Sequence, residues 1–407
     1  MSLVSLRFPS LATGEPPGDW PQWRGPQRNG HCPGPAWPDR LSAESLQEGW
    51  RIPLSESYSG PIVAEDRVFT TETRDRKFEV VRAVDRTTGE TLWKAQWEGA
   101  LRVPFFAAAN GSWIRSTPAY DGQSLFVAGM RDVLVCLDAR NGDQRWRVDF
   151  VQQFDTPLPP FGFVCSPLVA GDHVYVQAAA SFVKLEKATG KVVWRTAQDA
   201  GGMFGSAFSS PMLANLGGRQ QLVVQTRRSL KGIDEQTGEE LWSRPIEAFR
   251  GMNILTPTPH GSAIFTSAHS GKTQLWKIVH RDDRFAVEEA WSLPAQGYMS
   301  SPVIIAGHAY LHLRNQRFAC IDLASGREKW RTRPYGKYWS LVARGDRILA
   351  LDERGDLLLI RANPEKFQLL GSVPLSDDPT WAHLAVSGSQ LFVRELKALV
   401  AYTWQSP

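Results

Sequence analysis

The stretch best suited to chemistry by residue type and spacing is 269–273, which reads HSGKT. A Gly-Lys-Thr ending is typical of loops whose backbone N–H groups and lysine hold nucleotide phosphates. Such a loop also needs a glycine five residues before Gly271, where this chain has Thr266. The stretch lies between two predicted strands, whereas a phosphate loop leads from a strand into a helix. We therefore expect no nucleotide site here.

Other patterns that mark catalytic or metal sites are missing from the sequence. It has no C-x-x-C pair, no C-x-x-C-H haem attachment, no H-E-x-x-H and no G-x-S-x-G. Its eight histidines are scattered without the spacing of metal ligands. We therefore predict no catalytic residue, no cofactor-binding residue and no metal ligand.

A different motif recurs along the chain and indicates its architecture. The stretch 83–93, AVDRTTGETLW, places Asp85, Gly89 and Trp93 four residues apart. Asp accepts backbone N–H groups two residues on, and Gly supplies the positive φ of a short hairpin loop. Each copy therefore predicts a strand, a tight turn and a strand. The same offsets return in 136–146, 232–242 and 320–330, and in 184–194 with Glu186 in place of Asp.

The period of the motif predicts a β-propeller. The tryptophans that end successive repeats are 39 to 53 residues apart, at positions 93, 146, 194, 242, 291 and 330. A second marker precedes the repeats as SGP, STP, CSP, SSP and SSP, starting at Ser59, Ser116, Cys165, Ser209 and Ser300. Each repeat contains four short apolar strands, so neighbouring four-stranded sheets must cover each other around an axis. We predict an all-β propeller of eight blades, with seven as the alternative.

The last predicted blade lacks one strand within its own repeat. Residues 381–404 offer three strands, and the missing fourth is EGWRIPL, residues 48–54. Trp50 would then take the position between blades, and the closed ring would leave no strand edge exposed. We therefore expect an N-terminal extension or strap over residues 1–46 and a single propeller domain over 47–404.

The cysteines and the composition limit the class of protein. Cys136 and Cys320 each stand two residues before the turn Asp, in blades two and six. These blades lie opposite each other in the ring, so the two cysteines are too far apart for a disulfide. We predict four free thiols. The net charge of +4 comes from 46 basic and 42 acidic residues, which does not favour nucleic-acid binding. No apolar stretch is long enough to span a membrane. The first eighteen residues contain no signal-peptide core, and we expect an exported, monomeric protein.

The pattern A-x-D-x-x-x-G-x-x-x-W resembles the tryptophan-docking motif of quinoprotein dehydrogenases, eight-bladed propellers that hold pyrroloquinoline quinone (PQQ). Residues 83–93 match it in full, and the similarity covers about residues 47–404. The segment DWPQWRGPQRNG, residues 19–30, resembles a segment before such repeats in exported bacterial PQQ-like proteins.

The resemblance implies two kinds of function. The dehydrogenases hold PQQ with calcium between a Trp floor and a disulfide of adjacent cysteines, and this chain has no adjacent cysteines. A second branch, which includes the propeller lipoprotein of outer-membrane assembly, is non-catalytic and binds proteins; this chain has no lipobox cysteine near its start. We expect a non-enzymatic binding or scaffold propeller with a protein or peptide partner and no cofactor. The alternative is a PQQ-dependent or sugar-directed enzyme with an atypical axial site.

Unequal loops between blades locate a candidate site. From Trp93 to Pro118 the chain takes 25 residues, but from Trp291 to Pro302 it takes only 11. We predict a lopsided aromatic pocket beside blades one to four, with Arg115 pointing into it; the alternative is that the loops only plug the channel. The candidate residues are Tyr58, Trp113, Arg115, Phe163, Phe208, Asn253, Tyr298, Tyr338, Trp339 and Trp381. The long loops also contain Phe105, Phe106, Phe154, Phe161 and Phe204.

Overall fold

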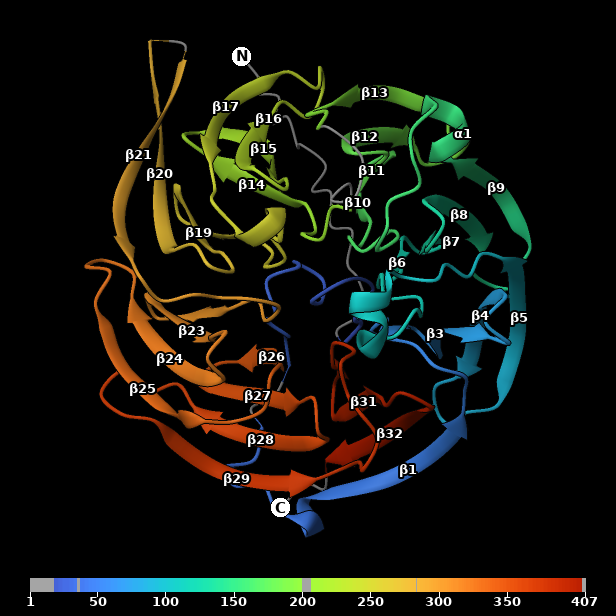
Figure 1. The fold of residues 1–407 in the computed structure, drawn as a ribbon. Helices are drawn as coiled ribbons and strands as arrows, with labels where there is room; N and C mark the ends of the chain where they lie inside the picture. The colour runs from blue at the N-terminus through green and yellow to red at the C-terminus, as the bar shows by residue number, and fades with distance from the viewer. Residues whose placement is uncertain (1–17, 35–36, 200–205, 283, 405–407) are drawn as a thin grey trace, which may run out of the picture.

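Thirty-two strands form eight four-stranded antiparallel sheets in the computed structural model, which describes residues 18–34, 37–199, 206–282 and 284–404. Figure 1 shows the sheets arranged as a ring around an axis. The short innermost strand of each blade starts near the axis, and the fourth strand lies at the rim. The predicted all-β propeller of eight blades is confirmed.

Blades one to four follow each other along the chain. Blade one contains β2 (Ile62–Ala64), β3 (Arg67–Arg74), β4 (Phe78–Asp85) and β5 (Thr91–Glu98). Blade two contains β6 (Ala119–Tyr120), β7 (Ser124–Gly129), β8 (Val133–Asp138) and β9 (Gln144–Asp149). Blade three contains β10 (Leu168–Ala170), β11 (His173–Ala178), β12 (Ser181–Glu186) and β13 (Val192–Thr196). Blade four contains β14 (Met212–Leu216), β15 (Arg219–Gln225), β16 (Ser229–Ile233) and β17 (Glu240–Pro245).

Blades five to seven repeat this order. Blade five contains β18 (Thr258–His260), β19 (Ala263–Ser267), β20 (Thr273–Arg281) and β21 (Arg284–Leu293). Blade six contains β22 (Val303–Ile305), β23 (His308–His312), β24 (Arg317–Asp322) and β25 (Glu328–Pro334). Blade seven contains β26 (Trp339–Arg344), β27 (Arg347–Asp352), β28 (Asp356–Arg361) and β29 (Gln368–Pro374). The helical turns of the described residues are η1 (Ala43–Ser45), η2 (Phe105–Asn110), α1 (Phe150–Phe154) and η3 (Phe249–Gly251).

Blade eight joins the two ends of the chain. It contains β30 (Ala385–Ser387), β31 (Gln390–Arg394), β32 (Ala398–Trp404) and, on its outer side, β1 (Leu46–Pro53). β1 and β32 are antiparallel, with Leu46 opposite Trp404 and Pro53 opposite Ala398. The predicted closure of the ring by residues 48–54 is therefore confirmed.

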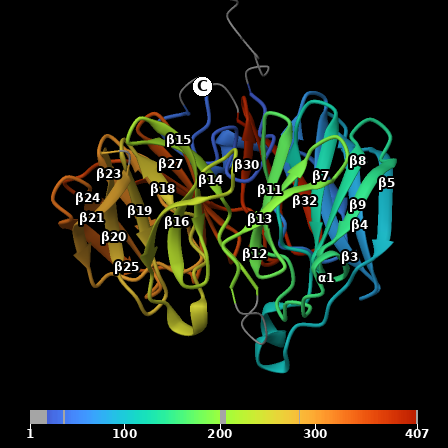
Figure 2. The same cartoon turned by 90° about the horizontal axis from the view of Figure 1, so that it is seen from above.

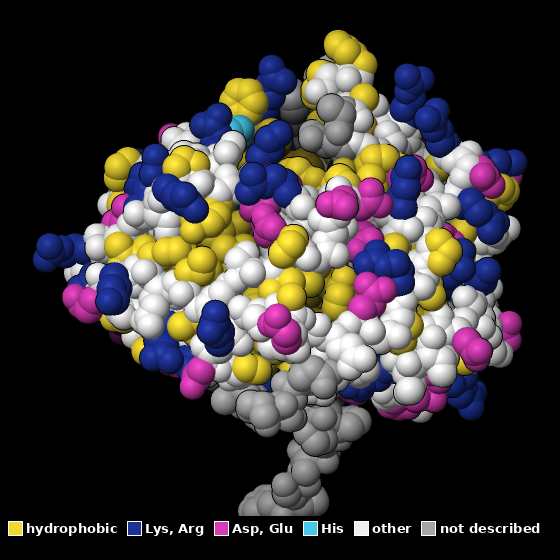
Figure 3. All heavy atoms as spheres, turned by 90° about the horizontal axis from the view of Figure 1, so that it is seen from below, with side chains coloured by type: hydrophobic (Ala, Val, Ile, Leu, Met, Phe, Trp, Pro, Cys, Tyr) yellow, Lys and Arg dark blue, Asp and Glu magenta, His cyan; other side chains and the backbone are white. Residues whose placement is uncertain are grey.

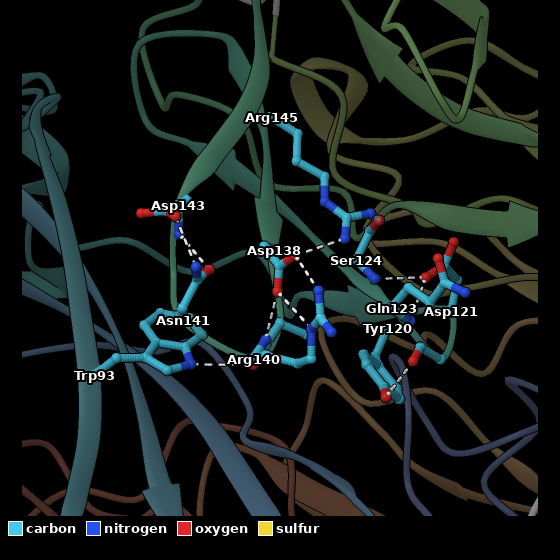
Figure 4. Close-up of polar contacts among 12 residues, drawn as sticks. Trp93, Tyr120, Asp121, Gln123, Ser124, Asp138, Arg140, Asn141, Asp143 and Arg145 are labelled. Atoms are coloured by element: carbon cyan, nitrogen blue, oxygen red, sulfur yellow. Dashed lines mark hydrogen bonds and ion pairs between the residues drawn. The ribbon is translucent and has the colours of Figure 1, made fainter.

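The tryptophan of one blade docks on the turn of the next blade. A Cβ built on Gly142 of blade two would lie 2.5 Å from the ring of Trp93 in blade one, so only glycine lets the ring approach. The Trp93 Nε1 donates to the carbonyl of Ala139 over 3.0 Å (Figure 4). Trp50, Trp146 and Trp291 repeat this hydrogen bond with the carbonyls of Arg86, Lys187 and Leu323.

Two tryptophans in the repeat depart from this arrangement. Trp194 lies on Gly238, but its Nε1 finds no acceptor in the described chain, and Lys184 donates to the carbonyl of Glu235 at the corresponding turn position. Trp242 donates to Gln221 within its own blade over 2.7 Å. Blade five lacks the Asp-Gly turn of the other repeats, and Trp242 is buried in a hydrophobic cluster that blades four and five share.

All four cysteines are free and buried, as predicted. Cys136 lies opposite Trp146 and Cys320 opposite Trp330, which shows why this position needs a small side chain. Across the described residues no helix is long and apolar enough to cross a membrane.

Residues 18–34, the strap, cross one face of the ring. The Arg28 guanidinium is buried and donates to the carbonyls of Ser166 at 3.0 Å, Pro167 at 2.6 Å and Pro211 at 3.0 Å. Arg24 donates to the carbonyl of Pro302. These carbonyls belong to the CSP and SSP markers, so the two arginines bind the starts of the inner strands. Strap residues contact every blade in turn, through Val63, Tyr120, Pro167, Pro211, Thr256, Pro302, Ala343 and His383.

Candidate axial binding site

A cavity of about 550 Å³ lies on the axis, on the side of the ring opposite the strap. Trp23 of the strap lines it and donates its Nε1 to Thr256 over 3.2 Å, so the strap forms part of the floor. The loops that connect blades form the walls. Figure 2 shows two helical turns, η2 in cyan and η3 in yellow, projecting from this face, while the blue strap lies at the other.

All eight blades contribute to the lining, which makes the cavity central. Blades five to eight supply Thr256, Tyr298, Tyr338 and Trp381, among others. The expected pocket beside blades one to four was therefore misplaced. Every blade places residues beside its inner strand in the lining, whatever the length of its loops. The predicted face, where the fourth strand of one blade returns to the first of the next, is the face that carries the cavity.

Six of the ten candidate residues line this axial cavity. They are Tyr58, Arg115, Phe208, Tyr298, Tyr338 and Trp381. All six precede an inner strand, where the chain descends beside the axis. Phe161, from the loop between β9 and β10, also lines the cavity.

The other four candidates lie behind the cavity wall. The Trp339 ring is fully buried and its Nε1 donates to Asp352 over 3.0 Å. The Asn253 amide donates to the carbonyls of Thr226 at 3.1 Å and Arg227 at 3.0 Å. Phe163 is buried in the hydrophobic cluster shared by blades two and three. Trp113 supports Tyr58 edge-on, with ring centroids 5.1 Å apart.

The remaining loop aromatics have separate roles. Phe105 and Phe106 of η2 are 89% and 50% exposed, so they stand at the mouth of the cavity. Phe154 lies at the end of α1, where the Arg195 guanidinium covers its ring at 4.2 Å. Phe204 lies outside the described residues.

Arg115 is half-buried in the cavity wall and held by its own loop. Its Nε donates to the carbonyl of Trp113 over 3.2 Å, and its Nη2 to that of Gly111 over 3.1 Å. Burial lowers the pKa of the guanidinium to about 10, so it stays charged at neutral pH. Among the described residues no carboxylate forms an ion pair with it. The geometry therefore orients a fixed positive charge toward the cavity.

Aromatic rings form much of the wall. Tyr338 and Trp381 are stacked, with centroids 5.8 Å apart and planes at 13°. The ring centroids of Tyr58 and Trp381 are 6.1 Å apart. Burial raises the pKa of Tyr58 and of Tyr338 above the usual range, so both hydroxyls stay neutral donors. Such a wall suits an apolar or aromatic group of a ligand.

Sequence reasoning missed several lining residues. His269, Arg314 and Gln316 come from the loops between the second and third strands of blades five and six. His269 packs against Tyr298 with ring centroids 4.7 Å apart, and burial lowers its pKa. Thus the one stretch with a chemical pattern, HSGKT, does reach the cavity, through its first residue. Lys337 and His383 also line the cavity and precede the inner strands of blades seven and eight. Their position before an inner strand is the feature that led to Tyr338 and Trp381 as candidates.

The charges of the lining have one sign. Arg115, Arg314 and Lys337 are its basic residues, and none of the described lining residues is Asp or Glu. No group of three His, Cys, Asp or Glu side chains in the described part of the chain could hold a metal ion. The site offers cations, aromatic rings and hydroxyls.

Eight four-stranded blades, joined by a docking tryptophan and closed by an N-terminal strand, define a PQQ-like propeller. The chain belongs to this family: residues 77–332 match the family model described as outer membrane protein assembly factor BamB.

Two curated relatives illustrate the family. BamB of Yersinia pestis is 22% identical over 259 residues, which cover 60% of this chain and 63% of that protein. The serine/threonine-protein kinase AfsK of Streptomyces coelicolor is 28% identical over 310 residues, which cover 74% of this chain and 33% of the kinase. The match thus spans less than two thirds of either relative.

Solved structures share the fold. BamB from Moraxella catarrhalis superimposes with a TM-score of 0.64 at 15% identity, covering 89% of this chain and 98% of that one. Quinohemoprotein alcohol dehydrogenase from Comamonas testosteroni superimposes with a TM-score of 0.58 at 12% identity, covering 97% of this chain and 82% of that one. Both likenesses concern the arrangement of the blades.

Proposed function

We propose that the protein is a non-catalytic binding propeller that holds a protein or peptide partner at its axial cavity. The observation that carries this proposal is the cavity itself, a concave site with aromatic walls and the fixed charge of Arg115, which has no ion-pair partner in the described part of the chain. Concave sites with a few oriented polar groups among aromatic side chains are typical of ligand recognition. The relatives named as outer membrane protein assembly factors support a protein partner and an exported location.

The lining does not fit the alternative of calcium-dependent PQQ chemistry. Calcium takes six to eight oxygen ligands, most often from carboxylates, and the described lining holds no Asp or Glu. Adjacent cysteines are missing from the sequence. A sugar-directed hydrolase would need a pair of carboxylates at the same place. A binding role requires none of these groups.

Site-specific photo-crosslinking in the native host tests the proposal. A photoreactive phenylalanine at Phe208, in the cavity, should yield a discrete adduct with another polypeptide. The same group at Leu369, an exposed residue of β29 on the outer side of the ring, serves as control and should yield none. A quinone absorbance together with stoichiometric calcium in the purified native protein would instead establish the enzyme alternative.

A further inference from the structure

We propose that the axial cavity recognises an acidic segment of the partner polypeptide, one that also carries aromatic or aliphatic side chains. This inference rests on the proposed function and specifies the chemistry of the partner. It follows from the charge of the lining, the arrangement of its cations and an aromatic path that leads out of the cavity.

The lining differs in charge from the rest of the molecule. The whole chain has 46 basic and 42 acidic residues, and on the side of the ring in Figure 3 the two signs are interspersed. In the cavity, Arg115, Arg314 and Lys337 face no Asp or Glu among the described lining residues. No ion pair within the described chain involves any of these three cations. A cation-lined concavity raises the local concentration of anions and favours their binding.

Arg115 provides the geometry for a carboxylate. Two of its nitrogens donate to backbone carbonyls, which fixes the plane of the guanidinium, and Nη1 has no partner among the described residues. A half-buried charge without a counter-ion is costly, and an anionic ligand would remove that cost. A planar guanidinium held in one orientation is well suited to bind a carboxylate.

The cations stand on different sides of the axis, which indicates a ligand with several carboxylates. Arg115 belongs to blade two, whereas Arg314 and Lys337 come from blades six and seven. In an eight-bladed ring, blades two and six are opposite. A single carboxylate cannot reach both sides, but acidic residues spaced along a peptide can.

An aromatic path connects the cavity to its mouth. The rings of Phe208, Phe161, Phe106 and Phe105 are linked in this order, with centroids 5.8, 6.2 and 5.7 Å apart. Phe208 and Phe161 line the cavity, while Phe105 is 89% exposed. On the same face, Phe249 of η3 is 46% exposed. Exposed aromatic rings of this size mark interaction sites. A small acid inside the cavity would leave the outer rings bare, whereas a polypeptide that continues outward would cover them.

Fluorescence anisotropy with synthetic peptides tests the inference. The probe is a short labelled peptide in which Glu alternates with Phe, and the controls replace every Glu with Lys or every Phe with Ser. We expect the Glu-Phe peptide to bind, the Lys-Phe peptide not to bind, and the Glu-Ser peptide to bind more weakly. The affinity should fall as salt is added, because screening weakens charge pairing.

Variants then assign the binding to the cavity. Arg115→Gln and Lys337→Gln should each weaken the Glu-Phe peptide by about tenfold, the effect of one charge-assisted contact. Lys337 is exposed, so Lys337→Gln should not disturb folding. It therefore tests the inference even if Arg115→Gln unfolds the protein. Arg281→Gln, which removes an exposed cation at the outer hairpin of blade five, should leave the affinity unchanged.

Four results would overturn the inference. The Lys-Phe peptide could bind as tightly as the Glu-Phe peptide, or the Arg115 and Lys337 variants could bind the Glu-Phe peptide with full affinity. In a third result, citrate or calcium-free PQQ would displace the peptide at concentrations equal to it, and Phe106→Ala would leave the affinity for the peptide unchanged. That combination would show that the cavity binds a small acid. A polypeptide crosslinked at Phe208 through a segment without acidic residues would refute the inference and leave the proposed function standing.

Discussion

The indole of Trp93 and the carbonyl of Ala139 are joined by a hydrogen bond of 3.0 Å across the boundary between blades one and two. The turn that presents this carbonyl is held by Asp138, which accepts from the Arg140 N–H over 2.8 Å. Gly142 closes the turn by donating its N–H to the Asp138 carbonyl over 2.8 Å. The tryptophan of one blade and the turn of the next therefore act as one unit, which explains why Asp, Gly and Trp recur together.

A double-mutant cycle tests this unit. Trp93→Ala should lower the free energy of unfolding by about 3–5 kcal/mol, the range for a core tryptophan. Gly142→Ala should cost about 1–3 kcal/mol for steric overlap, because the new Cβ would lie 2.5 Å from the Trp93 ring. In the Trp93→Ala background that overlap disappears, so the two effects should not add. Urea denaturation of the four proteins measures the coupling.

The control for this cycle is Gly122→Ala. Gly122 has a φ of +99°, yet a Cβ built there meets nothing within 4 Å, so the substitution carries backbone strain without overlap. Its effect should be independent of Trp93. Additive effects of Trp93→Ala and Gly142→Ala would show that the ring and the turn are energetically separate.

Closure of the ring by β1 can be tested with two N-terminal deletions. Deleting residues 1–41 removes the strap but leaves the pairing of β1 with β32, whereas deleting residues 1–53 removes both. The longer deletion should expose the edge of β32 and cause aggregation, because an unpaired edge recruits other chains. Light scattering after size-exclusion chromatography compares the two. If the 54–407 fragment is monomeric and melts at the same temperature as the 42–407 fragment, β1 does not close the ring.

The blade pattern could be predicted because its signals are local. Each Asp-x-x-x-Gly-x-x-x-Trp copy contains its own turn residues, and Trp50 marked the strand that returns from the other end of the chain. The sequence did not show that the Trp242 indole would donate to a side chain of its own blade. Its ring turns to Gln221 because the acceptor turn in blade five is missing.

The candidate site could be located by face but not by side-chain direction. Tyr338 lines the cavity while its neighbour Trp339 points into the core, since successive residues of an extended chain face opposite sides. Nothing in a single sequence decides which of the two faces the axis. His269 and Arg314 reach the cavity through turns between strands, and the strap reaches it over long range, so neither carried a local signal.

A buried carboxyl in blade one should make stability depend on pH. Burial raises the pKa of Glu79 from its usual 4.5 to about 7, although Met130 N–H and the Trp97 indole donate to it. Between these values the folded protein keeps a proton that the unfolded chain has lost, so this contribution to stability is lost as the pH rises through about 7. The loss for Glu79 is on the order of 3 kcal/mol.

Glu79→Gln should flatten this pH dependence. The free energy of unfolding would be measured in urea from about pH 5 to about pH 8. Part of the slope should remain, because burial also raises the pKa of Asp132 to about 7. Glu90→Gln, at an exposed turn position, should leave the slope unchanged. If Glu79→Gln retains the full slope of the parent protein, the Glu79 carboxyl does not titrate in this range.

Arg28 should be irreplaceable even by lysine. Its three guanidinium nitrogens donate to the carbonyls of Ser166, Pro167 and Pro211, and a lysine ammonium cannot reproduce this planar set. Arg28→Lys should therefore cost about 1–3 kcal/mol for each buried carbonyl left without a donor. Because the strap supplies Trp23 to the cavity floor, the variant should also weaken peptide binding without touching the lining cations. Gln27→Ala, at the exposed neighbouring position, is the matched control for both measurements. An Arg28→Lys variant with the stability and peptide affinity of the parent would show that charge alone, rather than the hydrogen-bond geometry, holds the strap in place.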